Sequence, residues 1–176
     1  MTIPHDPENF EIRLDPGLAF GTGTHPTTAL CLEWLDSRTL DGTRVVDYGC
    51  GSGILAIAAA LKGAAQVDCV DNDPQALEAT AANAGRNGVA GAIRCLDPES
   101  FTAQGADIVL ANILAGPLIE LAPVISGATR AGGHIVLSGL LEEQVEQVVT
   151  AYRPACGAGE VEVLEGWARV VLEKGP

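Results

Sequence analysis

Short runs of β-branched residues alternate with longer segments rich in Ala and Leu along most of the chain. The short runs predict strands at 43–48, 66–71, 93–96, 107–112 and 133–138. The longer segments predict helices at 54–62, 74–87, 118–129 and 142–151, the third of which has to accommodate Pro123. This alternation predicts an α/β fold in which helices flank a mostly parallel central sheet.

The two ends of the chain depart from this alternation. Near the carboxyl end, runs at 161–164 and 168–172 flank Glu165-Gly166, which predicts an antiparallel last strand pair and seven strands in all. Near the amino end, residues 14–28 are rich in Gly and Thr, and a helix of about ten residues follows through Trp34. We expect a single compact domain, with a Gly/Thr loop and helix at 1–40 and the core at 41–176.

The composition narrows the classes of function. A chain of 176 residues with 47% hydrophobic and 19% charged residues is too apolar to be disordered. A net charge of −13 argues against direct binding to a nucleic-acid backbone and suits a basic partner. Acidity that only keeps the protein dissolved is the alternative.

The cysteines and histidines do not form a metal pattern. The five Cys include no C-x-x-C pair, and the three His lie far apart, so we expect reduced thiols and no metal site. The longest apolar run, 54–61, is too short to cross a bilayer, and the start of the chain lacks a leader pattern. We therefore expect a cytoplasmic protein, without membrane attachment and monomeric.

A glycine-rich turn follows the first predicted strand. It spans 49–53, and in an open α/β sheet such a turn lies at the carboxyl edge, where ligands bind. Asp71 ends the second strand about 20 residues beyond Gly49, the spacing at which a carboxylate can hold both hydroxyls of a ribose. Gly49, Gly51 and Asp71 together predict a site for a nucleoside-containing cofactor, with a tight turn and a solvated acid as the alternative.

Residues around this turn indicate which cofactor fits. Ile54 stands where a dinucleotide fingerprint has its third glycine, and no Gly-Lys-Ser/Thr sequence ends the turn. Asp47 precedes the turn by two residues, where its carboxylate would repel a diphosphate. S-adenosylmethionine carries a sulfonium and an ammonium, which the same carboxylate attracts. We therefore predict S-adenosylmethionine as the cofactor.

Transfer of a methyl group from a sulfonium requires positioning of the nucleophile more than acid–base catalysis. Asn112 ends the fourth predicted strand, and its oxygens can orient an incoming amine and accept its hydrogen bonds. The alternative is that this residue only forms a turn. The sequence 112–115 lacks the Pro-Pro-aromatic continuation used on planar amides and nucleobases, so we predict an aliphatic amine as the acceptor.

Four blocks of the sequence, at 14–28, 47–58, 71–76 and 112–115, resemble the bacterial methyltransferases of ribosomal large-subunit protein eleven. The resemblance implies a Rossmann-like class I methyltransferase fold. It also implies S-adenosylmethionine-dependent trimethylation of lysine side chains and of an N-terminal α-amine. The implied partner is a basic ribosomal protein.

The resemblance further implies roles for single residues. Thr28 contacts the methionine end of the cofactor, Gly49 its backbone face, Asp71 the ribose and Asn112 the edge where the methyl group is transferred. Phe20 covers the cofactor, which makes 1–40 a cofactor-covering segment. Independently of the resemblance, the helix after Pro26 is expected to present free backbone N–H groups, which suit a methionine carboxylate near Thr28.

Two features depart from the family. Asn72 replaces a residue that is more usually apolar, and the chain begins only a few residues before the Gly/Thr loop. The N-terminal domain with which family members grip the ribosomal protein is therefore expected to be absent. This leaves two alternatives to methylation of that protein, namely a module that binds the cofactor without turnover and a methyltransferase for another amine.

Overall fold

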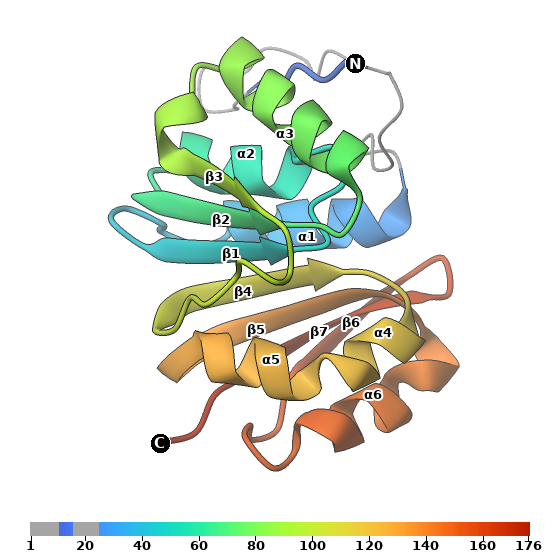
Figure 1. Cartoon of the computed structure of the whole chain (residues 1–176). Coiled ribbons are helices and arrows are strands. Elements are labelled where there is room, and N and C mark those ends of the chain that lie inside the picture. Colours follow the sequence, from blue (N-terminus) through green and yellow to red (C-terminus); the bar gives the residue numbers. More distant parts are fainter. Residues whose placement is uncertain (1–10, 16–24) are drawn as a thin grey trace.

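The computed structural model describes residues 11–15 and 25–176, and its elements alternate as the sequence predicts (Figure 1). The strands are β1 Arg44–Tyr48, β2 Gln66–Val70, β3 Ile93–Leu96, β4 Ala106–Asn112, β5 Thr129–Leu141, β6 Glu160–Leu164 and β7 Trp167–Glu173. The helices are α1 Pro26–Asp36, α2 Ile54–Leu61, α3 Pro74–Arg86, α4 Ala115–Glu120, α5 Ala122–Ala128 and α6 Val145–Tyr152.

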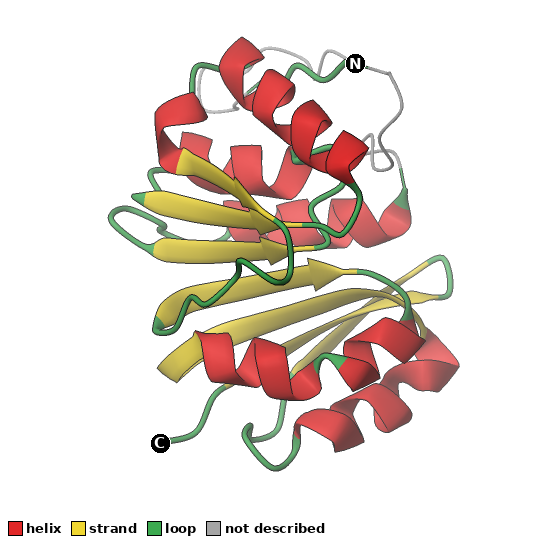
Figure 2. Cartoon of the chain, in the orientation of Figure 1, coloured by secondary structure: helices red, strands yellow, loops and turns green. Residues whose placement is uncertain are grey.

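The strands form one seven-stranded sheet in the order β3-β2-β1-β4-β5-β7-β6. The first five strands are parallel, and β7 lies antiparallel between β5 and β6 (Figure 2). The predicted Rossmann-like sheet with an antiparallel last pair is thus confirmed. Because β1 and β4 are neighbours although α2, β2, α3 and β3 separate them in sequence, the strand order reverses there and opens a ligand-binding crevice.

Helices cover both faces of the sheet, and successive residues of a central strand pack into two separate hydrophobic cores, one on each face. Val45 packs with Trp34 and Leu55 on the α1–α3 face, whereas Val46 packs with Leu118 and other residues on the α4–α6 face. Burial on both faces explains why the central strands are nearly continuous apolar runs. The carboxyl ends of β1, β2 and β4 are therefore fixed between two cores.

The predicted helix at 118–129 is wrong in its continuity. The structure has two helices, α4 and α5, which meet at Leu121, and Pro123 lies in the first turn of α5. A proline is tolerated there because the first-turn N–H groups have no partner within the helix. β5 is also longer than predicted, since it runs from Thr129 to Leu141.

Two further observations concern the expected environment of the chain. All five cysteines are free thiols. Within the described residues, every helix is too short or too polar to span a lipid bilayer.

Candidate active site

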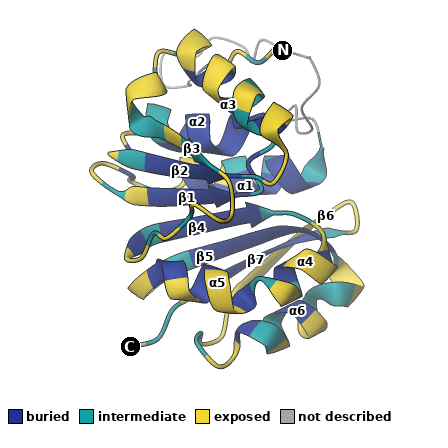
Figure 3. Ribbon diagram, in the orientation of Figure 1, coloured by how far each residue is buried: buried dark blue, intermediate teal, exposed yellow. Residues whose placement is uncertain are grey.

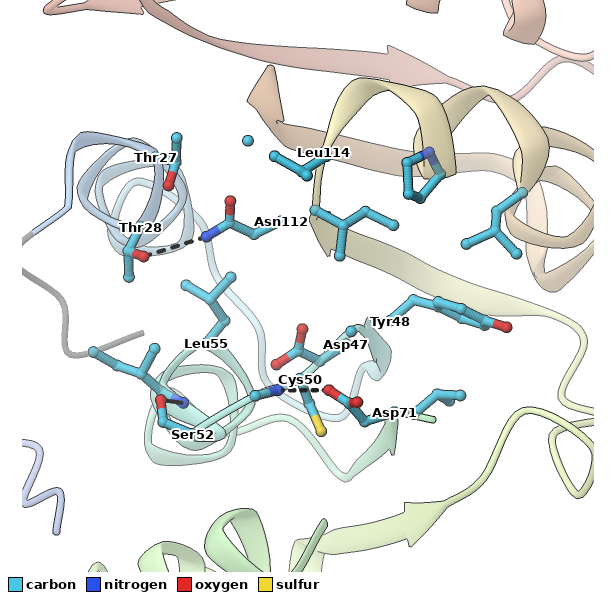
Figure 4. Close-up of a pocket in the computed structure, with 18 of the residues that line it drawn as sticks. Thr27, Thr28, Asp47, Tyr48, Cys50, Ser52, Leu55, Asp71, Asn112 and Leu114 are labelled. Atoms are coloured by element: carbon cyan, nitrogen blue, oxygen red, sulfur yellow. Dashed lines mark hydrogen bonds between the residues drawn. The ribbon is translucent and has the colours of Figure 1, made fainter. Parts of the chain in front are cut away.

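A cavity of about 900 Å³ opens at the carboxyl edge of the sheet, beside the crevice between β1 and β4. The predicted site residues that belong to the described part of the chain all line it, namely Thr28, Asp47, Gly49, Gly51, Asp71 and Asn112. Phe20 lies outside the described residues. Figure 4 shows the side chains of Thr28, Asp47, Asp71 and Asn112 converging from α1 and from the ends of β1, β2 and β4.

The β1–α2 turn forms one wall of the cavity and requires glycine at its first position. The N–H groups of Gly49 and Cys50 both donate to the Val70 carbonyl, at 2.7 and 3.1 Å. Gly49 has φ +82°, and a Cβ atom there would lie 2.5 Å from Cγ2 of Ile113. A side chain would therefore be strained and would collide with the segment that follows Asn112.

Asp71 is held at the end of β2 by backbone donors. Its Oδ2 accepts a hydrogen bond from the N–H of Gly51 at 3.1 Å, and its Oδ1 accepts one from the N–H of Asp73 at 3.0 Å. Each carboxylate oxygen can accept a second hydrogen bond. The orientation of Asp71 is thus fixed before any ligand arrives, and capacity is left for a pair of neighbouring hydroxyls.

Asp47 is the deepest charged group of the cavity. Only 1% of its surface is exposed, and its Oδ2 accepts a hydrogen bond from the N–H of Ala56 at 3.2 Å. Burial raises the pKa of Asp47 to about 7; the bond from Ala56 lowers it and the charge of Asp71 raises it further. No salt bridge between described residues reaches this carboxyl. A positive charge placed in the cavity would therefore stabilise the ionised form of Asp47.

Asn112 lies across the cavity from Asp71, where β4 ends (Figure 4). Its Nδ2 donates to Oγ1 of Thr28 at 3.2 Å, which fixes the amide against α1. Its Oδ1 has no hydrogen-bond donor among the described residues and points towards the side of the cavity where Thr27 and Leu114 lie. The side chain thus offers an acceptor atom in a defined position.

The expectation of free N–H groups at the start of α1 is wrong. The N–H of Thr27 donates to Nδ1 of His25 at 3.3 Å, and those of Thr28 and Ala29 donate to the His25 carbonyl at 3.1 Å. His25 is the N-cap of α1, so its ring and carbonyl satisfy donors that would otherwise face the cavity. Thr28 contributes its hydroxyl, through Asn112.

Ile113, which follows Asn112, lies closely packed between two glycines, Gly49 and Gly139. Gly49 touches the side chain of Ile113 from one side, while a Cβ atom on Gly139 would lie 2.3 Å from the Ile113 carbonyl oxygen. Gly139 has φ +91°. Because both positions admit no side chain, the backbone that places Asn112 and Leu114 has little freedom to move. Sequence reasoning missed Gly139, which has no flanking glycine.

Sequence reasoning also missed His25, Trp167 and Leu114, among other residues of the cavity. His25 and Trp167 form an edge-to-face ring pair with centroids 5.0 Å apart, and both line the cavity. Leu114 lines it too, although 67% of its surface is exposed. Leu114 follows the strand-ending Asn112 by two residues, so its proximity to the site could have been predicted, but no local pattern links Trp167 to a site more than fifty residues away.

Together these groups make a cavity with one acidic and one apolar wall. Asp47 and Asp71 stand at the ends of β1 and β2, and Leu114 and Trp167 extend the opposite side. In the described part of the chain, no group of His, Cys, Asp and Glu side chains is arranged to hold a metal ion. The arrangement suits a ligand that combines vicinal hydroxyls with a positive charge and presents it to an uncharged acceptor.

Comparisons with known proteins point to one family. A family model described as Ribosomal protein L11 methyltransferase matches residues 1–175. The Ribosomal protein L11 methyltransferase of Ectopseudomonas mendocina is 55% identical over 166 residues, which are 94% of this chain and 57% of that protein. The corresponding protein of Pseudomonas putida is 58% identical over 158 residues, 89% of this chain and 54% of that protein.

The comparison of structures agrees with that of sequences. The crystal structure of a ribosomal protein L11 methylase from Lactobacillus delbrueckii matches with a TM-score of 0.85 at 30% identity. The match covers 94% of this chain and 86% of that chain. The chain therefore spans a little over half the length of the two curated relatives, 57% and 54%.

Proposed function

The chain belongs to the family of ribosomal protein L11 methyltransferases, and from that premise we propose that its cavity binds S-adenosylmethionine and directs methyl groups to amines of a ribosomal large-subunit protein. The observation that carries the proposal is the meeting of Asp47, Asp71 and Asn112 around one cavity. Each of these side chains has hydrogen-bonding capacity or charge that the described residues leave unused.

The residues of the cavity fit the cofactor. A volume of about 900 Å³ is in the range of roughly 300 to 1,000 Å³ found for small-molecule sites. Asp71 would accept hydrogen bonds from the ribose hydroxyls, and the turn at Gly49 and Gly51 would allow close approach of the ligand to the backbone. Asp47, which lacks a cationic neighbour in the described chain, would face the positive charge. The sulfonium of the cofactor supplies the methyl group in its reactive form.

The residues on the opposite wall would position the acceptor. Oδ1 of Asn112 would accept a hydrogen bond from the incoming amine, and Thr28 would hold the amide in that orientation through the bond to Nδ2. Leu114 and Trp167 would line the approach, and their apolar surfaces favour the neutral amine over the ammonium. The neutral amine is the form that has a lone pair to donate.

The finer parts of the proposal rest on charge and resemblance. A net charge of −13 favours a basic ribosomal protein as the partner and disfavours direct contact with nucleic acid. Phe20 and the rest of 1–40 would cover the cofactor, and 41–176 would bind it. We further propose that the protein acts as a monomer in the cytoplasm.

Calorimetric titration tests the cofactor site. S-adenosylmethionine should release heat with one-to-one stoichiometry, whereas NADH should not, because Asp47 stands where its diphosphate would lie. Absence of heat with the methyl donor would contradict the proposal and also the alternative of a binding module without turnover.

Transfer of a labelled methyl group tests the activity. The label should appear on the basic ribosomal protein, and Asn112→Ala should reduce its rate by about 100-fold while the cofactor still binds. Binding without transfer, at every pH where a lysine is partly neutral, would favour the binding module. Label on soluble amines in place of the ribosomal protein would favour a different acceptor.

A further inference from the structure

No described strand pairs with the outer edge of the sheet at β6. β6 is the last strand in the sheet order, and each of its residues from Glu160 to Leu164 is exposed (Figure 3). The exposed fractions of Val161 and Val163 are 46% and 41%, so two apolar side chains of this edge strand are partly in contact with solvent. Edge strands of this kind accept an additional strand unless something protects them.

The pairing with β7 determines which backbone groups of β6 are free. Glu165 and Gly166 have φ of +52° and +82°, so the β6–β7 connection is a two-residue type I′ turn closed by the pair Leu164 and Trp167. Hydrogen-bonded and non-hydrogen-bonded pairs alternate from that point. The N–H and C=O groups of Val161 and Val163 therefore point away from β7, towards the open edge. Among described residues, no backbone bond outside the strands reaches them.

The side chains of β6 alternate between an apolar and an acidic face. Val161 lies opposite Val170 and Val163 opposite Ala168, so these valines share the apolar face of β7 that packs towards α4–α6. Glu160 and Glu162 point to the other face. A strand added to this edge would be best matched if it alternated apolar and basic residues, because directly opposed side chains interact most strongly.

The negative charge around β6 indicates which kind of segment can pair with this edge. Glu160, Glu162 and Glu165 are the only charged residues between positions 154 and 168. The exposed Glu142 adds to them, since its N–H donates to the Gly166 carbonyl at 3.0 Å. A second copy of this chain would place glutamates opposite glutamates, which repel. A basic segment meets both the hydrogen-bonding and the charge requirement.

We propose that β6 binds an extended basic segment of the substrate protein as an additional strand. Binding at this edge would bring the substrate protein to the cavity, and this part of the proposal rests on the function proposed above. Trp167 closes the turn next to Leu164 and also lines the cavity. A segment paired with Val161 and Val163 therefore runs along the hairpin to the carboxyl edge of the sheet, where the chain that continues beyond the paired residues can turn towards Asn112.

Amide hydrogen exchange on the full chain tests the pairing. The probe is an acetylated peptide of six residues that alternates Lys and Val. It should slow exchange at Val161 and Val163 at least tenfold and leave Glu160 and Glu162, whose amides already face β7, unchanged. A peptide of the same sequence with N-methylated valines should have no effect, because it cannot form the ladder. Equal slowing by both peptides, or no slowing, would overturn the proposal.

Two variants separate pairing from general attraction between charges. Val163→Pro removes the outward N–H without touching the β6–β7 ladder, so it should abolish the slowing at Val161. Glu160→Gln combined with Glu162→Gln should lower the affinity for the peptide about tenfold, since each exposed ion pair contributes modestly to binding. The matched control is Glu78→Gln with Glu99→Gln, two acids remote from β6, which should change the affinity less than twofold. Equal weakening by the two pairs of changes would overturn the proposal.

Two other measurements keep the outcomes distinct. Protection of Val161 and Val163 that grows with protein concentration in the absence of peptide would show that a second copy is the occupant, and would overturn the proposal. Heat from S-adenosylmethionine should be the same in all these variants. Loss of that heat would contradict the proposed function. Unchanged heat together with no pairing of the peptide would contradict only the proposal that β6 binds a strand.

Discussion

The two walls of the cavity are built by different means. On the wall formed by β1 and β2, backbone N–H groups hold the acidic side chains, from Ala56 to Asp47 and from Gly51 and Asp73 to Asp71. On the wall formed by β4, a bond between side chains holds Asn112, and Leu114 is largely exposed. A backbone scaffold suits a ligand that never changes, and a side-chain scaffold suits an acceptor that arrives on another protein.

The largest effect is expected behind the wall formed by β4, at Gly139 of β5. Gly139→Ala would force a residue into φ +91° and press its Cβ against the Ile113 backbone. We expect the free energy of unfolding to fall by about 4 kcal/mol, measured by chemical denaturation, because a backbone contact cannot relax by rotation of a side chain.

The matched control for this change is Gly85→Ala. Gly85 lies within α3, and a Cβ atom added there would meet open space. Alanine there should raise the free energy of unfolding by about 0.5 to 1 kcal/mol. Similar effects at the two positions would contradict the close approach of Gly139 to the Ile113 backbone.

The next largest effect concerns the wall formed by β1 and β2, where Asp47 should make the free energy of unfolding depend on pH. The pKa of Asp47 is about 7 in the folded protein against an ordinary value of 3.8. The folded state therefore binds more protons between these values, and its stability falls as the pH rises from about 4 to 7. The free energy of unfolding of Asp47→Asn, relative to that of the original protein, should therefore increase by about 4 kcal/mol between pH 4 and pH 8. Parallel denaturation curves for the two proteins would contradict this.

Cofactor binding should show the same linkage in reverse. A positive charge beside Asp47 favours its ionised form, so the affinity for S-adenosylmethionine should increase as the pH rises towards and through about 7. Calorimetry in buffers of different ionisation enthalpy should detect a proton released on binding near pH 6. Asp47→Asn should abolish that release.

A smaller effect is expected from Asp71→Asn. One amide group would then face a backbone N–H of Gly51 or Asp73, with which it cannot bond, and the negative charge would be lost. We expect cofactor affinity to fall by about 30-fold, or about 2 kcal/mol, in a calorimetric titration. An affinity within threefold of the original would mean that Asp71 does not hold the ribose.

The smallest effect is expected on the side-chain wall, at Thr28. Thr28→Val removes the acceptor for Nδ2 of Asn112 and should lower the rate of methyl transfer by about fivefold, or about 1 kcal/mol, with cofactor affinity unchanged. Thr28→Ser keeps the hydroxyl and should restore the rate. Equal losses in both variants would point to packing of the methyl group as the role of Thr28.

Much of the fold was predictable because the relevant signals are local. Strand periodicity and the Gly49–Gly53 turn indicated the parallel sheet and the position of Asp71, and the structure agrees. The failures arose where tertiary contacts decide. A break at Leu121 that lets Pro123 start a new helix, and a His25 ring that occupies the first donors of α1, depend on neighbours that the sequence pattern does not specify.

The same limit explains the incomplete site. Asp47, Gly49 and Asp71 were found because they share one βαβ unit, whose geometry is fixed by its length. Trp167 and Gly139 reach the cavity only because β7 and β5 bring them there, and strand order is not encoded by a short-range signal. Prediction thus recovered the backbone-held wall better than the side-chain wall.

The sheet order β5-β7-β6 also has a consequence for the time course of synthesis. Each of the parallel strands β1, β2 and β3 can join a neighbour that precedes it in the chain or follows it closely, and β6 is joined to β7 by the two residues Glu165 and Gly166, but the outer edge of β5 stays open until α6, β6 and β7 have all been made. Until Trp167–Glu173 has been made, β5 is left with an open edge and β6 has no partner. The nascent chain therefore exposes two unpaired strands until β7 inserts between them, and this is the interval in which it is most vulnerable to aggregation.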